Sequence, residues 1–289
     1  MAFVSLDEIV RACDDTGKEI WEIIAENDAR DRGTTEEDTF EKMKNMYLQM
    51  RLSDSIYDGS LRSRSGLAGG DGQKMQAFMS SENRLISDFL TSVMAKAIKM
   101  GESNACMRRI VAAPTAGSCG VIPAVLLTYE EYRDTSEDQM VKALLVAAGI
   151  GEVIASVASI SGAEGGCQAE IGSASAMAAG ALTFLEGGSP KTVMQAVAIA
   201  VKSILGLTCD PVAGLVEVPC IKRNASGAVN AIIASQMAMA GIESRIPPDE
   251  VLDSMRRIGK LIPQCLRETG EEGLATTPTA IAIKNTISE

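Results

Sequence analysis

The chain has 289 residues, of which 46% are hydrophobic and 22% charged, a composition typical of a globular protein. Its formal net charge of −11 argues against a nucleic-acid partner, because the molecule would on average repel a phosphate backbone. The chain contains no histidine, which excludes a Ser-His-Asp triad, a Cys-His nucleophile and histidine-ligated zinc within it. Any catalysis would therefore use thiols, carboxylates, lysines or groups supplied by a partner.

The first 60 residues carry much of the negative charge, with 15 Asp and Glu against 7 Lys and Arg. Charged and apolar positions alternate there at helical spacing, so that Ile9, Ile20, Trp21 and Ile24 can share a face. This pattern predicts an acidic region of one or two amphipathic helices with a solvated face.

The amino-terminal stretch MAFVSLDEIVRACDDTGKEI is interrupted by charged residues and lacks the features of a targeting segment, which favours a cytoplasmic location. Two uncharged windows, 110–129 and 224–242, are long enough to raise the question of a membrane. The first is broken by proline and glycine, and the second contains Asn, Ser and Gln. Both windows are interpreted as buried segments, and no membrane partner is expected.

The remaining elements follow in chain order. The glycine-rich stretch SGLAGGDGQKM, residues 65–75, predicts a loop, and a helix is expected from Ala77 to Met100. AAPTAGSCGVIPAV, residues 112–125, predicts a turn. Residues 139–242 hold only 11 charged side chains and one aromatic residue, Phe184, among many Ala, Gly, Ser and Met. We therefore expect a mainly α protein, a single domain over 1–289, with closely packed small-residue helices and Gly/Pro loops carrying the site.

Three of the seven cysteines stand beside glycine or proline, namely Cys167, Cys209 and Cys220. Their spacings of 42 and 11 residues match no local zinc or ferredoxin pattern. Spacing alone favours buried structural thiols, while metal ligands and a nucleophile remain open alternatives.

Three longer stretches, VAAPTAGSCGVIPAVLL, GAEGGCQAEIGSASAMAAGAL and CDPVAGLVEVPCIKRNASGAVNA, together resemble the α subunit of iron-sulfur-dependent L-serine dehydratases. The resemblance covers most of the chain, is strongest over 111–242 and continues through EEGLATTPTAIAI. It implies a lyase that converts L-serine to pyruvate and ammonia, with a role in gluconeogenesis.

The resemblance also implies a 4Fe-4S cluster held by Cys167, Cys209 and Cys220. Gly165 and Gly166 would leave room for the cluster beside the first of these thiolates. Three protein ligands on four irons leave one iron open, which would act as a Lewis acid on the substrate hydroxyl.

A β subunit is the implied partner, since the family has a β region with a Ser-Ser-Ser-His-Thr type motif that this chain lacks. A heterodimer in which the β subunit supplies a histidine base is therefore expected. Within this chain the catalytic candidates are Lys222, Glu164 and Glu170. The two glutamates flank Cys167, where a carboxylate is as easily a helix cap.

Thr115, Gly117 and Ser118 are candidates for binding the substrate carboxylate, because donors in a glycine-rich turn form anion-binding nests. A simple turn between helices is the alternative. Asn224, with Lys222 and Arg223 before it, is a candidate for binding the carboxylate or hydrogen-bonding the cluster sulfurs. Solvation of a helix start is the alternative there.

The other four cysteines are interpreted as structural: Cys13, Cys106, Cys119 and Cys265. Two rival functions remain. One is an L-cysteine desulfidase of the same family, because the open iron could take a thiol. The other is a non-enzymatic cluster-binding subunit whose partner performs the chemistry.

Overall fold

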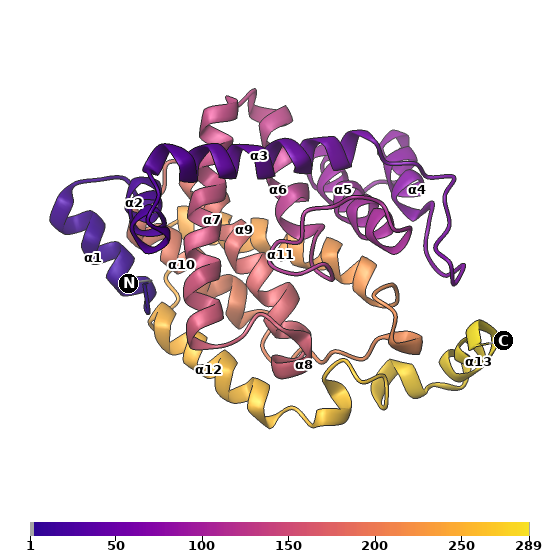
Figure 1. Ribbon diagram of the computed structural model, residues 1–289. Helices are drawn as coiled ribbons and strands as arrows, with labels where there is room; N and C mark the ends of the chain where they lie inside the picture. Colours follow the sequence, from indigo (N-terminus) through magenta and orange to yellow (C-terminus); the bar gives the residue numbers. More distant parts are fainter. Residues whose placement is uncertain (1–2, 289) are drawn as a thin grey trace.

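The computed structural model describes residues 3–288, and within this range the protein is helical and contains no β-strand, which confirms the mainly α prediction (Figure 1). The α-helices are α1 (Leu6–Thr16), α2 (Ile20–Arg32), α3 (Glu36–Ser55), α4 (Asp71–Ala77), α5 (Asp88–Ala105), α6 (Val121–Arg133), α7 (Glu137–Val157), α8 (Gly162–Gly165), α9 (Ser173–Leu185), α10 (Pro190–Lys202), α11 (Cys220–Met239), α12 (Pro248–Leu261) and α13 (Pro278–Ser288). A π-helical turn, η2 (Gln168–Gly172), leads directly into α9.

Helix α9 is the centre of the molecule and packs against α6, α7, α10 and α11 (Figure 1). Residues 173–183 are all buried, and most are Ala, Ser or Gly. The approach to α7 is so close that a Cβ added to Gly180 would lie 2.2 Å from Cδ1 of Ile150. Small side chains thus allow the tight packing that the composition of 139–242 predicts.

The amino-terminal region forms three helices, so the prediction of one or two is wrong. Gly17 and Gly33 end α1 and α2 with φ of +70° and +66°, a conformation that favours glycine. Ile9 therefore lies on α1, whereas the other three residues of the predicted apolar face lie on α2. All four still pack into or against the core, but from two helices.

Two predicted boundaries are also shifted. The loop predicted for 65–75 ends at Gly70, because α4 begins at Asp71. The helix predicted from Ala77 to Met100 is interrupted after α4 and resumes only at Asp88, where the Ser87 hydroxyl accepts a hydrogen bond from the backbone N–H of Leu90. In the predicted turn 112–125, residues from Val121 onward already belong to α6.

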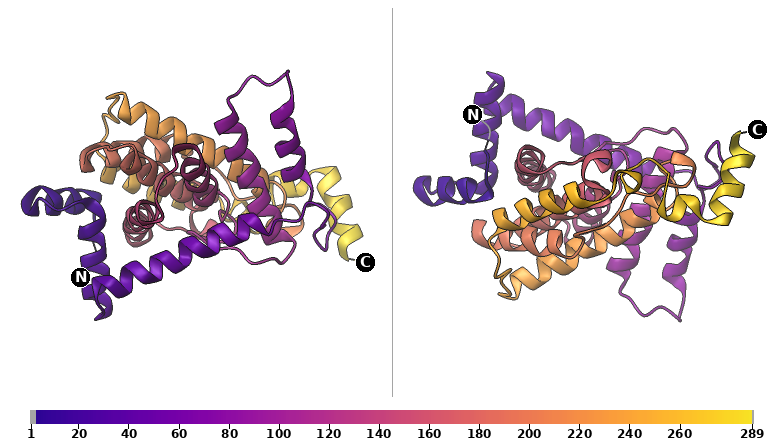
Figure 2. Two further views of the ribbon diagram at one scale, coloured as in Figure 1. Left: turned by 90° about the horizontal axis from the view of Figure 1, so that it is seen from above. Right: turned by 90° about the horizontal axis from the view of Figure 1, so that it is seen from below.

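The two ends of the chain lie at opposite ends of the molecule (Figure 2). The Asp249 carboxylate in the first turn of α12 accepts hydrogen bonds from the backbone N–H groups of Leu6 at 2.7 Å and Asp7 at 3.1 Å. This contact fixes α1 to α12. Beyond α12 the chain runs along the bundle, and α13 projects at the far end (Figure 1).

Among the described residues, α7 alone is long and apolar enough to cross a membrane by length and composition. Within its most apolar window, 67% is buried inside the protein, as in a core helix. The windows 110–129 and 224–242 do not meet this test.

Candidate active site

Three separate segments contribute the cysteines of the candidate site. Cys167 lies between α8 and the π-helical turn, Cys209 in the loop between α10 and α11, and Cys220 is the first residue of α11. Their exposed fractions are 2%, 2% and 7%. The structure therefore buries all three thiols that the resemblance implies as ligands.

Cys209 is held by a segment distant in the sequence. Its backbone N–H donates to the Leu266 carbonyl at 2.9 Å, and its carbonyl accepts from the Glu268 N–H at 2.7 Å. This pairing of Cys209 with the chain beyond α12 fixes an otherwise irregular loop.

Gln168, next to Cys167, connects three segments of the chain. The sequence analysis did not identify it as a site residue. Its side-chain carbonyl accepts from the Gly206 N–H at 2.9 Å, and its amide donates to the Met255 carbonyl at 2.8 Å. Its backbone N–H donates to the Leu207 carbonyl at 3.0 Å. The side chain is 1% exposed, so these bonds replace water and join Cys167 to the Cys209 loop and to α12.

The three thiols have different electrostatic surroundings. A hydrogen bond from the Cys209 thiol lowers the pKa of Cys167 against the effect of burial, and the Arg223 guanidinium lowers it further. The same hydrogen bond and burial raise the pKa of Cys209. Burial, with the nearby charges of Cys167 and Glu170, raises the pKa of Cys220 to about 12. The Arg223 guanidinium therefore favours the thiolate form of Cys167.

Arg223 is the cation of the site and is itself fixed by hydrogen bonds. It donates to the Thr208 carbonyl at 2.7 Å and to the Asp210 carboxylate at 2.9 Å. The other oxygen of Asp210 accepts from the Leu274 N–H at 3.0 Å. Asp210 is 5% exposed and was also missed, although a carboxylate directly after Cys209 in an apolar stretch could have indicated it.

The turn after Pro114 brings a second polar group to the cysteines. The Thr115 hydroxyl donates to the Glu170 carboxylate at 2.8 Å and lies 3.0 Å from the Ser118 hydroxyl. A Cβ added to Gly162 would lie 2.9 Å from Glu170 Oε2 and 3.1 Å from Cys209 Sγ. The Glu170 carboxylate thus lies between the turn and the thiol, with Gly162 leaving the space.

Glu170 is mostly enclosed, and this changes its acidity. Burial raises the pKa of its carboxyl group, the hydrogen bond from Thr115 opposes the rise, and the negative charge of Glu268 adds to it. Glu170 therefore keeps a proton at higher pH than an exposed glutamate does. Gly117 also faces it, since an added Cβ there would lie 3.2 Å from Glu170 Oε1.

Asn224 joins the turn to the cysteines. Its side-chain oxygen accepts from the Gly120 N–H at 2.8 Å, and its amide donates to the carbonyls of Gly117 at 2.8 Å and Cys220 at 2.9 Å. The side chain is 1% exposed. Asn224 therefore holds the turn against the first turn of α11, and its binding of substrate stays a prediction.

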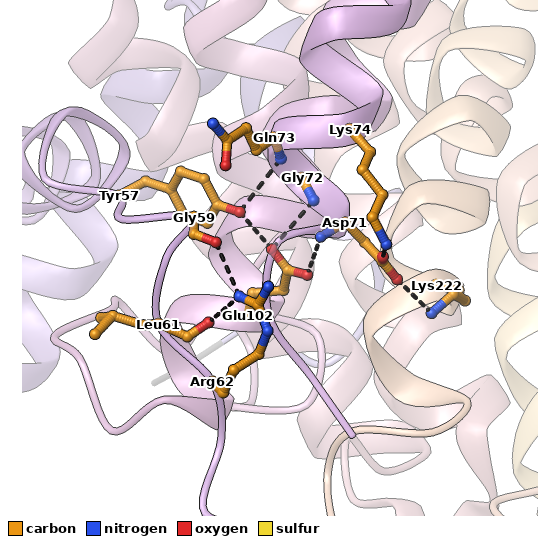
Figure 3. A network of polar contacts seen from close by, with 10 residues as sticks. All are labelled: Tyr57, Gly59, Leu61, Arg62, Asp71, Gly72, Gln73, Lys74, Glu102 and Lys222. Atoms are coloured by element: carbon orange, nitrogen blue, oxygen red, sulfur yellow. Dashed lines mark hydrogen bonds and ion pairs between the residues drawn. The ribbon is translucent and has the colours of Figure 1, made fainter. Parts of the chain in front are cut away.

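Lys222 and Glu164 do not join this group of side chains. The Lys222 ammonium lies 3.0 Å from the Asp71 carboxylate at the start of α4, and its side chain is 65% exposed (Figure 3). Glu164 is exposed, accepts from the Ser159 hydroxyl at 2.7 Å and lines a cavity of about 310 Å³ beside α12. Of the three acid-base candidates, Glu170 alone lies with Thr115 and Cys209.

The other cysteines occupy other surroundings. Cys119 is 1% exposed, its thiol lies 3.7 Å from the Met100 carbonyl, and burial raises its pKa to about 12. Cys13 lies on α1, Cys106 follows the last residue of α5, and Cys265 lies beyond α12. Their structural roles stay a prediction.

The comparison with known families identifies the chain. A family model described as "Serine dehydratase alpha chain" matches residues 15–275. The chain belongs to this family.

Individual relatives of the chain support the same assignment. Over 253 residues, 88% of this chain and 84% of the relative, it is 49% identical to a protein of Bacillus subtilis (strain 168) named "Probable L-serine dehydratase, alpha chain". It is 40% identical to the "L-serine dehydratase, alpha chain" of Peptoniphilus asaccharolyticus, over 96% of this chain and 95% of the relative. A longer relative, the "L-serine dehydratase" of Streptomyces coelicolor (strain ATCC BAA-471 / A3(2) / M145), is 38% identical over 93% of this chain and 60% of its own length.

The three buried thiols have the ligand chemistry of an iron-sulfur cluster, and the cluster itself stays a proposal. Among residues 3–288, no three His, Cys, Asp or Glu side chains converge closely enough to ligate one metal ion. A cubane cluster does not require this, because each thiolate binds a different iron. Three buried thiols beside a fixed guanidinium form an environment suited to an anionic cluster.

Proposed function

We propose that the chain is the cluster-bearing α subunit of a cytoplasmic L-serine ammonia-lyase that forms pyruvate and ammonia. The observation that carries this proposal is that Cys167 and Cys209 are buried in hydrogen-bond contact, with Cys220 near enough to affect the pKa of Cys209 and the Thr115–Glu170 pair beside them. The family assignment agrees with it, since the relatives are named L-serine dehydratases.

The residues that would hold the 4Fe-4S cluster are Cys167, Cys209 and Cys220. With one iron free of protein ligands, the cluster would supply a Lewis acid for the substrate hydroxyl. Thr115, Ser118 and the backbone of the turn would bind the carboxylate of serine.

Glu170 is the chain's own candidate proton donor. Its raised pKa lets it hold a proton in the enclosed site and deliver it to the departing hydroxyl, which then leaves as water. Loss of the α-proton to a base completes the elimination to aminoacrylate, which tautomerises and hydrolyses to pyruvate and ammonia. The chain has no histidine, so the β subunit is proposed to supply that base.

Anaerobic reconstitution of the purified chain with iron and sulfide, with and without the β subunit, tests the proposal. We expect a brown protein whose visible spectrum changes on addition of L-serine, and pyruvate only when the β subunit is present. Pyruvate formed by the α chain alone would move the base to this chain. A colourless protein without bound iron would contradict the cluster.

A further inference from the structure

Two exposed segments lie side by side at the end of α5. One is the loop after α3, which carries Arg62 and Arg64, and the other follows α5 and carries Arg108 and Arg109. Leu61 and Gly69 of the first segment and Arg108 of the second line one small cavity. We call these four arginines, together with Met107, the arginine rim.

The arginine rim borders the candidate active site. The Glu217 carboxylate, three residues before Cys220, accepts hydrogen bonds from the hydroxyls of Ser63 at 2.8 Å and Ser65 at 2.6 Å. On the other side, the Asn104 amide donates to the Ala116 carbonyl at 3.3 Å. The first contact joins the loop to the cysteine segment, and the second joins the end of α5 to the turn after Pro114.

The charge of the rim is unusual for this protein, whose net charge is −11. Arg64, Arg108 and Arg109 are exposed, and their guanidinium groups make no hydrogen bond or ion pair within residues 3–288. Arg62 bonds only to the carbonyls of Gly59 and Leu61 in its own loop (Figure 3). Arg62 and Arg108 both act on Cys106, so these two cations lie close together, and Arg108 also faces Asp58. Four exposed arginines in two adjacent segments of an acidic protein attract an acidic surface.

Met107 adds an exposed apolar side chain between these cations. It lies two residues beyond the last residue of α5, with φ of +57° at a position where glycine or asparagine is usual, and is 91% exposed. The bonds from the N–H of Arg108 to the Ser103 carbonyl at 2.8 Å and from that of Met107 to the Asn104 carbonyl at 3.0 Å complete the helix cap. A methionine in this conformation costs stability, and nothing within the described chain covers its side chain.

We propose that the arginine rim is the docking surface for the β subunit, whose matching face is acidic and has an apolar pocket for Met107. This inference rests on the proposed function, because a subunit that supplies the base must approach the cysteines. The rim lies where such a subunit would reach the turn after Pro114 and the segment before Cys220. A continuous acidic face is the partner chemistry that four arginines and one methionine fit.

The binding affinity of the reconstituted chain for the β subunit tests the surface. In Arg108→Glu/Arg109→Glu, we expect the dissociation constant to rise at least about tenfold at low salt and its salt dependence to weaken. Arg11→Glu/Lys191→Glu makes the same change in charge at the opposite end of the molecule, where α1 lies, and should bind like the wild type (Figure 2). If the rim variant binds the β subunit with unchanged affinity, the proposed docking surface is wrong. It is also wrong if the rim variant loses only the self-association of the α chain.

Met107→Gly separates docking from folding. Glycine accepts the positive φ, so thermal stability should be equal or higher, whereas affinity for the β subunit should fall. If Met107 has only a structural role, Met107→Gly should bind the β subunit as tightly as the wild type. That result would show that Met107 is not part of the docking surface. If wild-type α and β subunits associate but form no pyruvate, the proposed function fails while the docking surface stands.

Discussion

Residues 173–183 of helix α9 and residues 209–212 of the loop between α10 and α11 are buried, yet the two segments satisfy their polar groups in different ways. Residues 173–185 contain no charged side chain, and their backbone groups pair along the helix. The loop instead pairs Cys209 with Leu266 and Glu268 and buries the carboxylates of Asp210 and Glu217. The backbone of the helix thus depends on local bonding, whereas the backbone of the loop depends on partners distant in sequence, and the loop also carries buried charge.

The largest effect is expected from removing one of the three proposed cluster thiolates, of which Cys209 lies in the loop. Cys167→Ser, Cys209→Ser or Cys220→Ser should each abolish the cluster, because serine is a poor iron ligand. Iron content and visible absorption after anaerobic purification provide the measurement. Cys13→Ser and Cys265→Ser are the controls and should keep the cluster; a full cluster in any of the first three variants contradicts the ligand assignment.

Arg223 and Lys222, two neighbouring cations of α11, extend this comparison, because Arg223 is largely buried and Lys222 is exposed. Asp210→Asn should destabilise the cluster-free chain by about 3 kcal/mol, because it leaves the enclosed Arg223 without its counter-charge. Asp71→Asn, which removes the partner of the exposed Lys222, should cost less than about 1 kcal/mol. Chemical denaturation measures both free energies of unfolding. Equal losses of unfolding free energy in the two variants would show that the buried Arg223 needs its partner no more than the exposed Lys222 does.

The same contrast explains what the sequence could predict. The small-residue helices around α9 follow from composition, because Ala and Met favour helix and small side chains allow close packing. Boundaries failed where a single residue decides them, as at Gly17 and at Asp71. Gly17 is a local C-cap, whereas the first N–H groups of α4 donate to the Glu102 carboxylate of α5. The apolar pattern reveals neither feature.

In the site, the sequence indicated the cysteines through family motifs, and their spacing alone favoured structural thiols. Gln168 and Asp210 were missed because their partners, Met255 and Leu274, lie 87 and 64 residues away. Polar bridges of this kind depend on the tertiary structure. Glu170 could be named from its place beside Cys167, but its burial and its bond to Thr115 could not.

In helix α9, the next largest loss of stability is expected from adding a side chain where the packing is already close. Gly180→Ala should destabilise the chain by about 2 kcal/mol, because its Cβ would meet Ile150 Cδ1 at 2.2 Å and outweigh the helix preference of alanine. Gly172→Ala is the matched control, since its added Cβ would find its nearest neighbour at 3.9 Å. Thermal unfolding of both variants decides the point. A stabilised Gly180→Ala would mean that α7 and α9 can separate without cost.

The smallest effect is expected at a polar pair inside the helical core. The hydroxyls of Thr183 on α9 and Ser235 on α11 lie 2.9 Å apart, and both side chains are 0% exposed. Thr183→Val should cost about 1 kcal/mol, because it leaves the Ser235 hydroxyl without this partner in a site that water does not reach. Ser235→Ala should cost a similar amount.

The double variant Thr183→Val/Ser235→Ala should cost clearly less than the sum of the two single changes, since removing both partners leaves no unpaired group at this contact. A double-mutant cycle from denaturation curves measures this coupling. Strict additivity would show that the pair does not act as a unit. The contact of Thr183 with α11 would then owe its stability to packing, in sharper contrast to the charge-dependent loop that carries Cys209.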